Sequence, residues 1–231
     1  MLPAISVVIP TRNEAAPLPR LLERLKTMPR VSQIIVADGG SSDQTIAIAR
    51  AVGALVVEGA SGRGPQQNLG AQSATGEVLW FLHADCLPPR GADAQIARAI
   101  EHGAIGGNFR IHFDARGLAP RLFEFIARAQ RARGVYYGDS GLWLTRASWD
   151  QSGGFPAWPL FEDYALVRQL ESQGKTACCA GRLRVSARRF ERQPWKIMWL
   201  WLELQLRFQA GQAPDELARI YRERSGGKDK G

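Results

Sequence analysis

Short apolar runs alternate with amphipathic segments through the first half of the chain. Four runs rich in strand-forming residues, each too short for an independent helix, cover residues 5–9, 33–37, 54–57 and 78–82. Polar or glycine-rich turns follow these runs, and leucines then recur at helical spacing from Leu18 to Leu25. The alternation predicts an α/β fold in which a mostly parallel central sheet is covered by helices on both faces.

The pattern changes after residue 104. Residues 108–113 alternate and predict a strand, and residues 142–144 predict another. Between them, an apolar helical stripe lies opposite four arginines; the stripe is Leu122, Phe125, Ile126 and Ala129, and the arginines are Arg121, Arg128, Arg131 and Arg133. Such a basic face is usually solvated, although it also suits a membrane surface or an anionic acceptor. Residues 195–208 are apolar nearly all round, which predicts a helix buried against the domain, a partner or the membrane interface; a plain tertiary helix is the default expectation.

Composition bounds the size of the protein and its partners. The 231 residues, 45% of them hydrophobic, are enough to bury the core of one large α/β domain. The net charge of +8 suits an anionic partner, such as a nucleotide phosphate, a nucleic acid or a lipid headgroup. Three cysteines form neither a disulfide framework nor a zinc-site spacing, which favours a reducing cytoplasm. We expect neither a signal peptide nor a membrane span, because the sequence shows no basic leader and no sufficiently long apolar run.

Carboxylates stand directly after two of the predicted strands. Asp38 follows the second strand and begins an Asp-Gly-Gly-Ser-Ser turn, and Asp85 ends the His-Ala-Asp that follows the fourth strand. Ligands of open α/β sheets collect at the carboxyl ends of the strands, so Asp85 is the first candidate for a metal ligand. The Gly-x-Gly-x-x-Gly fingerprint after the first strand and the complete Walker loop are both missing, which excludes those two ways of binding phosphate.

Four segments resemble glycosyltransferase family 2 in order and spacing: residues 6–14, 38–45, 63–70 and 82–85. The resemblance continues through Gly138-Asp139, the Gly-Gly-Phe-Pro of residues 153–156 and Glu162-Asp163, and covers about residues 4–192. It implies an inverting enzyme of the GT-A fold that uses a nucleotide-activated sugar. The Leu-His-Ala-Asp metal motif and the compact size are similar to a small bacterial subgroup whose substrate is not settled.

The resemblance also implies how the chain is divided. Residues 1–231 are expected to form a single GT-A domain, with a nucleotide-sugar-binding half that ends at about residue 110 and an acceptor and catalytic half that ends at about residue 192. C-terminal helices over 193–224 and a disordered tail over 225–231 are expected to follow. The glycine-rich residues 62–70 are expected to form a loop that leads into a helix.

Most polar residues of the turns are assigned by the resemblance to the nucleotide-sugar donor. Asp38 is expected to accept a hydrogen bond from uracil or ribose; the alternative is that Asp38 and Asp43 only shape the turn and cap the next helix. Gln67 is nearly as well explained as a solvated residue at a helix start. The complete set of expected donor-binding residues is Pro10, Arg12, Glu14, Asp38, Gly39, Arg63, Gln67, Asn68, His83, Ala84, Asp139, Arg188 and Arg189.

Asp85 matches the last carboxylate of the family's Asp-x-Asp motif, which bridges Mg²⁺ or Mn²⁺ to the diphosphate of the donor. Hard divalent cations share oxygen ligands with substrate phosphates, so one protein carboxylate can be sufficient. The chain departs from the motif at His83, which stands in place of the first Asp. A contact from His83 to sugar or phosphate and a purely structural role are both open.

Glu162 and Asp163 are the expected catalytic pair. Inverting transfer needs a carboxylate that takes the proton of the acceptor, and Asp163 matches that position of the family. The alternative is that the two acids only stabilise the start of a helix that continues through Leu166. Arg188 or Arg189 would neutralise the leaving diphosphate. Phe190 and Ser186 replace the Trp and Gln of processive relatives, so we expect transfer of one sugar per encounter.

The sequence therefore predicts transfer of a sugar from a nucleotide diphosphate, with UDP expected, to a small-molecule or lipid acceptor. A cytoplasmic location is expected, with peripheral contact to the inner face of the membrane through the basic and Trp-rich helices. Three alternatives are open: a nucleotide-sugar-binding protein without turnover, a sugar-phosphate nucleotidyltransferase, and a nucleic-acid-binding module. No nucleic-acid partner is expected, because the basic residues are spread along the chain.

Overall fold

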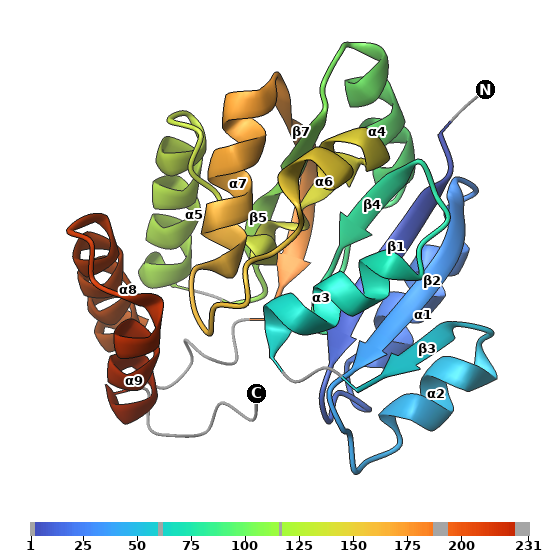
Figure 1. Ribbon diagram of the computed structural model, residues 1–231, viewed down its shortest axis with the longest axis horizontal. Coiled ribbons are helices and arrows are strands. Elements are labelled where there is room, and N and C mark those ends of the chain that lie inside the picture. The colour runs from blue at the N-terminus through green and yellow to red at the C-terminus, as the bar shows by residue number, and fades with distance from the viewer. Residues whose placement is uncertain (1–2, 60–61, 116, 187–193, 225–231) are drawn as a thin grey trace.

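The computed structural model describes residues 3–59, 62–115, 117–186 and 194–224 (Figure 1). Within these residues, seven strands form one sheet in the order β3-β2-β1-β4-β6-β5-β7. The strands are β1 (Ile5–Thr11), β2 (Val31–Asp38), β3 (Leu55–Glu58), β4 (Val78–Phe81), β5 (Gly106–Phe113), β6 (Trp143–Thr145) and β7 (Thr176–Val185). All four strands predicted in the first half of the chain are confirmed, and so are those at 108–113 and 142–144.

The sheet is mostly parallel, as predicted. Parallel pairs join β1 to β2 and β4, β2 to β3, and β5 to β7, whereas β6 runs antiparallel to β4 and β5. Because β1, β2 and β4 run in the same direction, the turns that follow Thr11, Asp38 and Phe81 lie at one edge of the sheet. This edge carries most of the residues that the sequence assigns to the donor.

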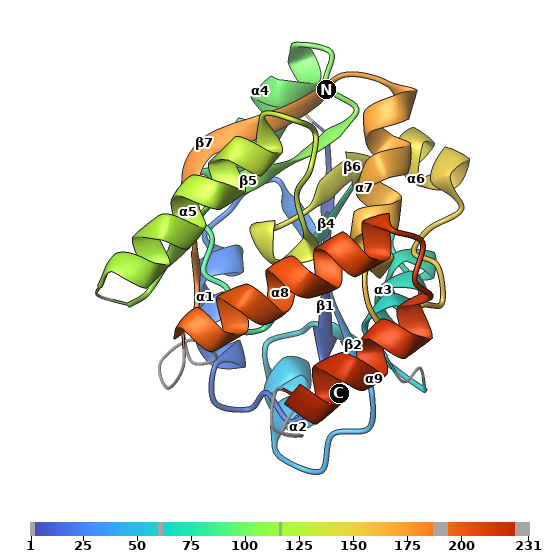
Figure 2. The ribbon, with the colours of Figure 1, turned by 90° about the vertical axis from the view of Figure 1, so that its left-hand side faces the viewer.

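Helices cover both faces of the sheet (Figures 1 and 2). Their bounds are α1 (Leu18–Lys26), α2 (Thr45–Ala51), α3 (Arg63–Gln72), α4 (Ala92–Glu101), α5 (Leu118–Arg131), the 3₁₀ helix η1 (Gly138–Ser140), α6 (Arg146–Ser152), α7 (Glu162–Gln173), α8 (Pro194–Gln209) and α9 (Pro214–Arg224). Side chains of a strand point alternately to the two faces, so Val7 packs with α1 and α4, whereas Val8 packs with α3 and α7. Two apolar cores result, one on each face.

Helices α8 and α9 form a third apolar cluster with the segment that begins α7. Leu200 and Leu204 of α8 are buried there beside Phe161, whose ring stacks on Phe208 with the centroids 4.7 Å apart. The other side of α8 is exposed, so the default expectation of a helix buried within the domain holds for one face only. Its exposed side chains follow helical spacing and are Trp195 (50% exposed), Trp199 (65%), Leu202 (44%) and Leu206 (57%).

Two further predictions about helices need correction. The glycine-rich residues 63–70 lie within α3 and do not form a loop, because Gly64 and Gly70 give the helix close contact with its neighbours. The predicted helix with the apolar stripe exists as α5, but Phe125 is 62% exposed, so the stripe does not face the core. On its basic face, Arg131 is largely buried and pairs with Glu171 at 3.4 Å.

None of the helices that the structure describes is long and apolar enough to cross a lipid bilayer.

Candidate active site

The turn after β2 holds Asp38 in a network of hydrogen bonds. The parallel register places Thr11 of β1 beside Asp38, whose side chain is fully buried. Asp38 Oδ1 accepts hydrogen bonds from the backbone N–H groups of Gly40 (2.9 Å) and Ser41 (2.7 Å). Asp38 Oδ2 accepts from the hydroxyls of Thr11 (2.9 Å) and Ser41 (2.6 Å). Both oxygens therefore shape the turn, as the alternative for Asp38 expected, and contact with uracil or ribose stays a prediction.

The turn after β1 is bound to the same network by Asn13, which sequence reasoning did not single out. Asn13 has a φ of 56°, a left-handed conformation that Asn tolerates better than most residues. Its Oδ1 accepts from the backbone N–H of Ser42 at 2.8 Å, and its own N–H donates to Ser41 Oγ at 2.8 Å. Next to it, the Glu14 N–H donates to Thr45 Oγ1 at 2.8 Å. The sequence signal was an Asn within a turn after a strand.

Three more donor candidates lie at this edge of the sheet. Pro10 is buried in β1, Arg12 is exposed directly after the strand, and Gly39 donates its N–H to the carbonyl of Thr11 at 2.9 Å. Asp43 accepts the N–H of Thr45 at the start of α2, so its expected capping role fits the geometry. Arg12 is therefore the most accessible side chain of the three.

Helix α3 bridges this edge to the second half of the chain. Arg63 is exposed at its first turn, and the Gln66 amide donates to the carbonyls of Thr11 and Ala37, both at 2.8 Å. A Cβ on Gly64 would lie 3.0 Å from the carbonyl oxygen of Pro156. Only a glycine therefore allows α3 to approach the turn before α7 so closely.

Asn68 and Gln67 have different surroundings within α3. Asn68 forms two hydrogen bonds with the backbone of Phe155: its Nδ2 donates to the carbonyl at 2.8 Å, and its Oδ1 accepts the N–H at 2.9 Å. Gln67 is 2% exposed, which excludes the solvated role, and its Oε1 has no hydrogen-bond partner among the described residues. Asn68 positions the turn before α7, and contact of either side chain with base or sugar stays a prediction.

The turn after β4 lies beside Asp139 of η1, whose carbonyl oxygen is 4.0 Å from Cys86 Sγ. Cys86 is buried, and its N–H donates to the carbonyl of His83 at 3.0 Å, which closes the turn around Ala84 and Asp85. Burial raises the pKa of the Cys86 thiol, and the negative charges of Asp85 and Asp139 raise it further. Asp139 therefore lies near Asp85, although the two belong to distant segments. His83 is half-buried, and both roles considered for it are open.

These two carboxylates are a suitable donor set for Mg²⁺ or Mn²⁺. The described residues contain no group of three or more His, Cys, Asp or Glu side chains that could hold a metal ion. A cation that also binds diphosphate oxygens needs only one or two protein carboxylates. Asp85, with Asp139 close by, therefore fits a metal that is shared with the donor.

Asp163 joins the start of α7 to the 3₁₀ helix η1. Its Oδ2 accepts a hydrogen bond from the N–H of Gly138 at 2.7 Å, and its Oδ1 accepts from the N–H of Tyr164 at 2.7 Å. Phe161, directly before the first residue of α7, has a φ of 65°, which is uncommon for a bulky side chain. Asp163 therefore stabilises the start of a helix, as the alternative to a catalytic role expects. It also lies beside Gly138-Asp139, where the family resemblance implies that substrate binds.

Glu162 is buried next to Asp163. It is 3% exposed, and burial, together with the charge of Asp163, raises its pKa to about 7; the charge of Arg63 opposes the shift. Burial likewise raises the pKa of Tyr137, and the nearby Asp163, Tyr164 and Asp139 add to the effect. The structure therefore brings the carboxylates of Glu162, Asp163 and Asp139 to one region, with Arg63 as a neighbouring cation.

Arg188 and Arg189, the predicted partners of the leaving diphosphate, lie outside the described residues, as does the tail over 225–231.

Residues 6–155 match the family model described as Glycosyl transferase family 2, so the chain belongs to this family. This confirms the resemblance read from the motifs at the strand ends.

Among curated relatives, the chain is 27% identical over 149 residues to glycosyltransferase AglE of Haloferax volcanii, which covers 58% of this chain and 48% of that protein. It is 32% identical over 154 residues to the undecaprenyl-phosphate 4-deoxy-4-formamido-L-arabinose transferase of Klebsiella pneumoniae. This match covers 61% of this chain and 47% of that protein. The matched part thus spans about half the length of these relatives. The mannosyltransferase PcManGT of Pyrobaculum calidifontis, solved with GDP-Man and Mn²⁺, superposes with a TM-score of 0.69 at 19% identity, covering 98% of this chain and 70% of that one. This structure confirms the GT-A fold.

Proposed function

We propose that the chain is an inverting glycosyltransferase that moves one sugar from a nucleotide-diphosphate donor to an acceptor hydroxyl or acid. The observation that carries the proposal is that several carboxylates lie around η1. Asp163 Oδ2 accepts the N–H of Gly138 at 2.7 Å, and the negative charges of Asp85 and Asp139 both raise the pKa of the Cys86 thiol. A carboxylate for proton transfer and carboxylates for a metal-bound diphosphate thus lie around one short segment, at the end of the parallel strands.

Each group has a distinct role in this proposal. Asp163 is the general base that takes the proton of the acceptor while the sugar carbon is attacked on the side opposite the diphosphate. Asp85, with Asp139 near it, would hold Mg²⁺ or Mn²⁺, which supplies positive charge to the diphosphate. Glu162 and the cation of Arg63 set the electrostatic environment next to Asp163, because Glu162 interacts electrostatically with both residues.

The donor and acceptor classes are inferred from the family. The resemblance implies a UDP-sugar, whereas PcManGT was solved with GDP-Man, so both bases belong in a test. The name of the Klebsiella relative refers to undecaprenyl phosphate, which supports a lipid acceptor; a small-molecule acceptor is the other part of the proposal.

Peripheral contact with the inner face of the cell membrane belongs to the same proposal, with the chain in the cytoplasm. Helices α5 and α8 lie side by side and are joined by a hydrogen bond from Gln130 to Gln205 at 3.0 Å (Figure 2). The exposed apolar side chains of α8 include Trp199, and those of α5 include Phe125. Amphipathic rings of this kind bind at the boundary between headgroups and acyl chains.

Donor binding tests the proposal most directly. Calorimetric titration with a panel of UDP- and GDP-sugars, with and without Mn²⁺, is carried out on the wild type, on Asp85→Asn and on Asp150→Asn. Asp150 is exposed on α6 and serves as the matched control. We expect metal-dependent binding that is weakened at least about tenfold in Asp85→Asn and unchanged in Asp150→Asn. Failure of every nucleotide sugar to bind would contradict the proposal, and binding without any hydrolysis or transfer would favour the alternative of a binding protein.

A further inference from the structure

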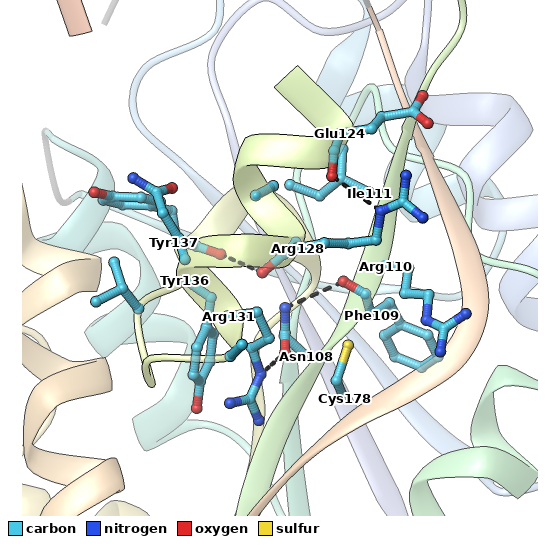
Figure 3. Close-up of a pocket in the computed structure, with 15 residues that line it drawn as sticks. Asn108, Phe109, Arg110, Ile111, Glu124, Arg128, Arg131, Tyr136, Tyr137 and Cys178 are labelled. Carbon is cyan, nitrogen blue, oxygen red and sulfur yellow. Dashed lines mark hydrogen bonds between the residues drawn. The ribbon is translucent and has the colours of Figure 1, made fainter. Parts of the chain in front are cut away.

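A cavity of about 540 Å³ lies between β5, α5 and the segment that leads into η1 (Figure 3). Its size is in the range of pockets that hold small organic ligands. None of the expected donor-binding residues that the structure describes lines it. The cavity is therefore separate from the strand ends at which the nucleotide is expected to bind.

One end of the cavity adjoins the candidate catalytic residues. Tyr137 and Ser140 line it, and they flank Gly138 and Asp139. The Gly138 N–H is bound to Asp163, and Ser140 Oγ donates to the carbonyl of Tyr137 at 2.5 Å. A molecule that fills the cavity would consequently end next to the proposed base.

Two arginines lie at the other end. Figure 3 shows the guanidinium groups of Arg110 and Arg128 on the side of the cavity opposite Tyr137. Both are exposed, and neither forms an ion pair within the part of the chain that the structure describes. The Nε of Arg128 donates only to the carbonyl of Glu124 in its own helix, at 3.3 Å. Their charges are available to an anion.

The remaining charged groups of the cavity are already bound. Arg131 donates to Asn108 Oδ1 and to Thr176 Oγ1, both at 2.8 Å, and lies over the ring of Tyr136 at 4.4 Å. The Glu124 carboxylate interacts with His112 Nδ1 at 2.9 Å and accepts the N–H of Phe113 at 3.0 Å. A bound anion would thus meet Arg110 and Arg128 as its nearest unpaired charges.

The walls between the two ends are largely apolar. Ile111 of β5, Ala127 of α5 and Val135, in the segment before Tyr137, contribute apolar side chains; Phe109 also lines the cavity but is itself fully buried in the core. An inorganic anion would leave this surface uncovered, whereas a hydrocarbon body would bury it. The pocket combines an anion site and an apolar channel that leads to the proposed base.

We propose that this cavity is the acceptor site, and that the acceptor is an amphipathic anion whose carboxylate or phosphate binds Arg110 and Arg128 while its apolar body lies against Ala127 and Val135. This inference rests on the proposed function, and it adds the class of acceptor. The reacting oxygen of the acceptor would then lie at the Tyr137 end, within reach of the base.

Cys178 provides a readout of occupancy that needs neither donor nor activity. Its side chain lines the cavity and is exposed, whereas Cys86 and Cys179 are buried. The rate of Cys178 alkylation by iodoacetamide is measured on the full chain, with mass spectrometry to locate the adduct. The probes are octyl phosphate and octanoate, compared with inorganic phosphate and the neutral octanol.

We expect the two amphipathic anions to slow alkylation strongly, and inorganic phosphate or octanol at equal concentration to have little effect. Replacing either arginine by glutamine (Arg110→Gln or Arg128→Gln) removes a charge-assisted contact and is expected to weaken protection about tenfold. Arg121→Gln changes an exposed arginine on the same helix that does not line the cavity, so it is the matched control. In this variant the probes should protect Cys178 as strongly as in the wild type. Octyl phosphate and octanoate together show whether phosphate or carboxylate is preferred.

Three outcomes would overturn the inference. Equal protection by octanol would show a merely apolar pocket, and equal protection by inorganic phosphate would show a simple anion site. No protection by any probe would show that the cavity binds neither class. Because no nucleotide sugar is present, failure here leaves the donor titration unaffected, and failure of that titration leaves Cys178 protection interpretable.

Discussion

Polar side chains have different kinds of partners in the two halves of the molecule. At the ends of β1 and β2, Asp38 and Asn13 use their oxygens and amides to hold the turns in place. Around α5 and α8, by contrast, Arg110 and Arg128 have no ion-pair partner among the described residues, and an apolar stripe on α8 is exposed. The first half is organised in advance of any ligand, whereas the second half presents surface that a ligand would complete.

This difference matches two different tasks. A nucleotide diphosphate is a fixed chemical shape, and rigid turns that present it with preset groups lower the entropy lost on binding. Acceptors differ in size and polarity, so an open cavity with two free cations accommodates them more readily. The proposed catalytic segment, η1, is bound to Asp163 of α7.

The largest effect is expected at this junction. Asp163→Asn keeps an oxygen that can accept the N–H of Gly138 but removes the proton acceptor, so turnover should fall about 10²–10⁴-fold. Donor affinity should change little, because the metal ligands are untouched. The measurement is donor hydrolysis or transfer beside calorimetric binding, with Asp150→Asn as control. Unchanged turnover would remove Asp163 from the base role.

The next effect tests whether the first half is as preorganised as its hydrogen bonds indicate. Asp38→Ala leaves the N–H groups of Gly40 and Ser41 and the hydroxyl of Thr11 without their acceptor, so the free energy of unfolding should fall by about 3 kcal/mol. Arg128→Gln, in the second half, should change it by less than about 0.5 kcal/mol. Urea unfolding monitored by circular dichroism measures both. A loss below about 1 kcal/mol in Asp38→Ala would contradict the contrast.

A third effect depends on pH. Burial and Asp163 raise the pKa of Glu162 from 4.5 to about 7, so the folded chain binds this proton more tightly than the unfolded chain. The resulting stabilisation is complete below pH 4.5 and is lost as the pH rises through 7. Glu162→Gln keeps the neutral form, so it should be more stable than the wild type at pH 8 by on the order of 1–3 kcal/mol, and similar to it at pH 4.

Urea unfolding at the two pH values checks this expectation, with the exposed Glu101→Gln as control. An equal difference at pH 4 and pH 8 would show that Glu162 does not titrate in this range.

The sequence alone predicted the strands and the family because both depend on local order. Apolar runs such as 78–82 and the acids that follow them are readable without tertiary contacts, and the structure confirms the strands that they predict. The glycine-rich α3 was misjudged because glycine lowers helix propensity, and the contact of Gly64 with Pro156 that compensates for this is a tertiary contact.

The cavity and the approach of Asp139 to the turn that holds Asp85 and Cys86 could not be predicted for the same reason. Residues 108–111, 127–128 and 135–140 come together only when α5 packs on β5, and no periodicity relates them. The exposed stripe on α8 could not be predicted from the sequence for a different reason. Because both faces of that helix are apolar, composition alone indicated burial, and only the packing of Leu200 and Leu204 shows which face is covered.

The smallest effect tests whether the exposed face of α8 contacts a membrane. Leu202 on α8 and Leu55 on β3 are 44% and 43% exposed, so Leu202→Ser and Leu55→Ser remove equal surface from opposite ends of the molecule (Figure 1). If α8 inserts between headgroups, Leu202→Ser should lose about 1 kcal/mol of binding to anionic phospholipid vesicles, about fivefold in affinity, and Leu55→Ser should lose none. Vesicle sedimentation measures both variants. Equal vesicle affinities of the two variants would mean that the exposed apolar face of α8 does not contact a membrane. The cavity beneath α5 would then be the ligand-accessible surface of the second half that remains in the proposal.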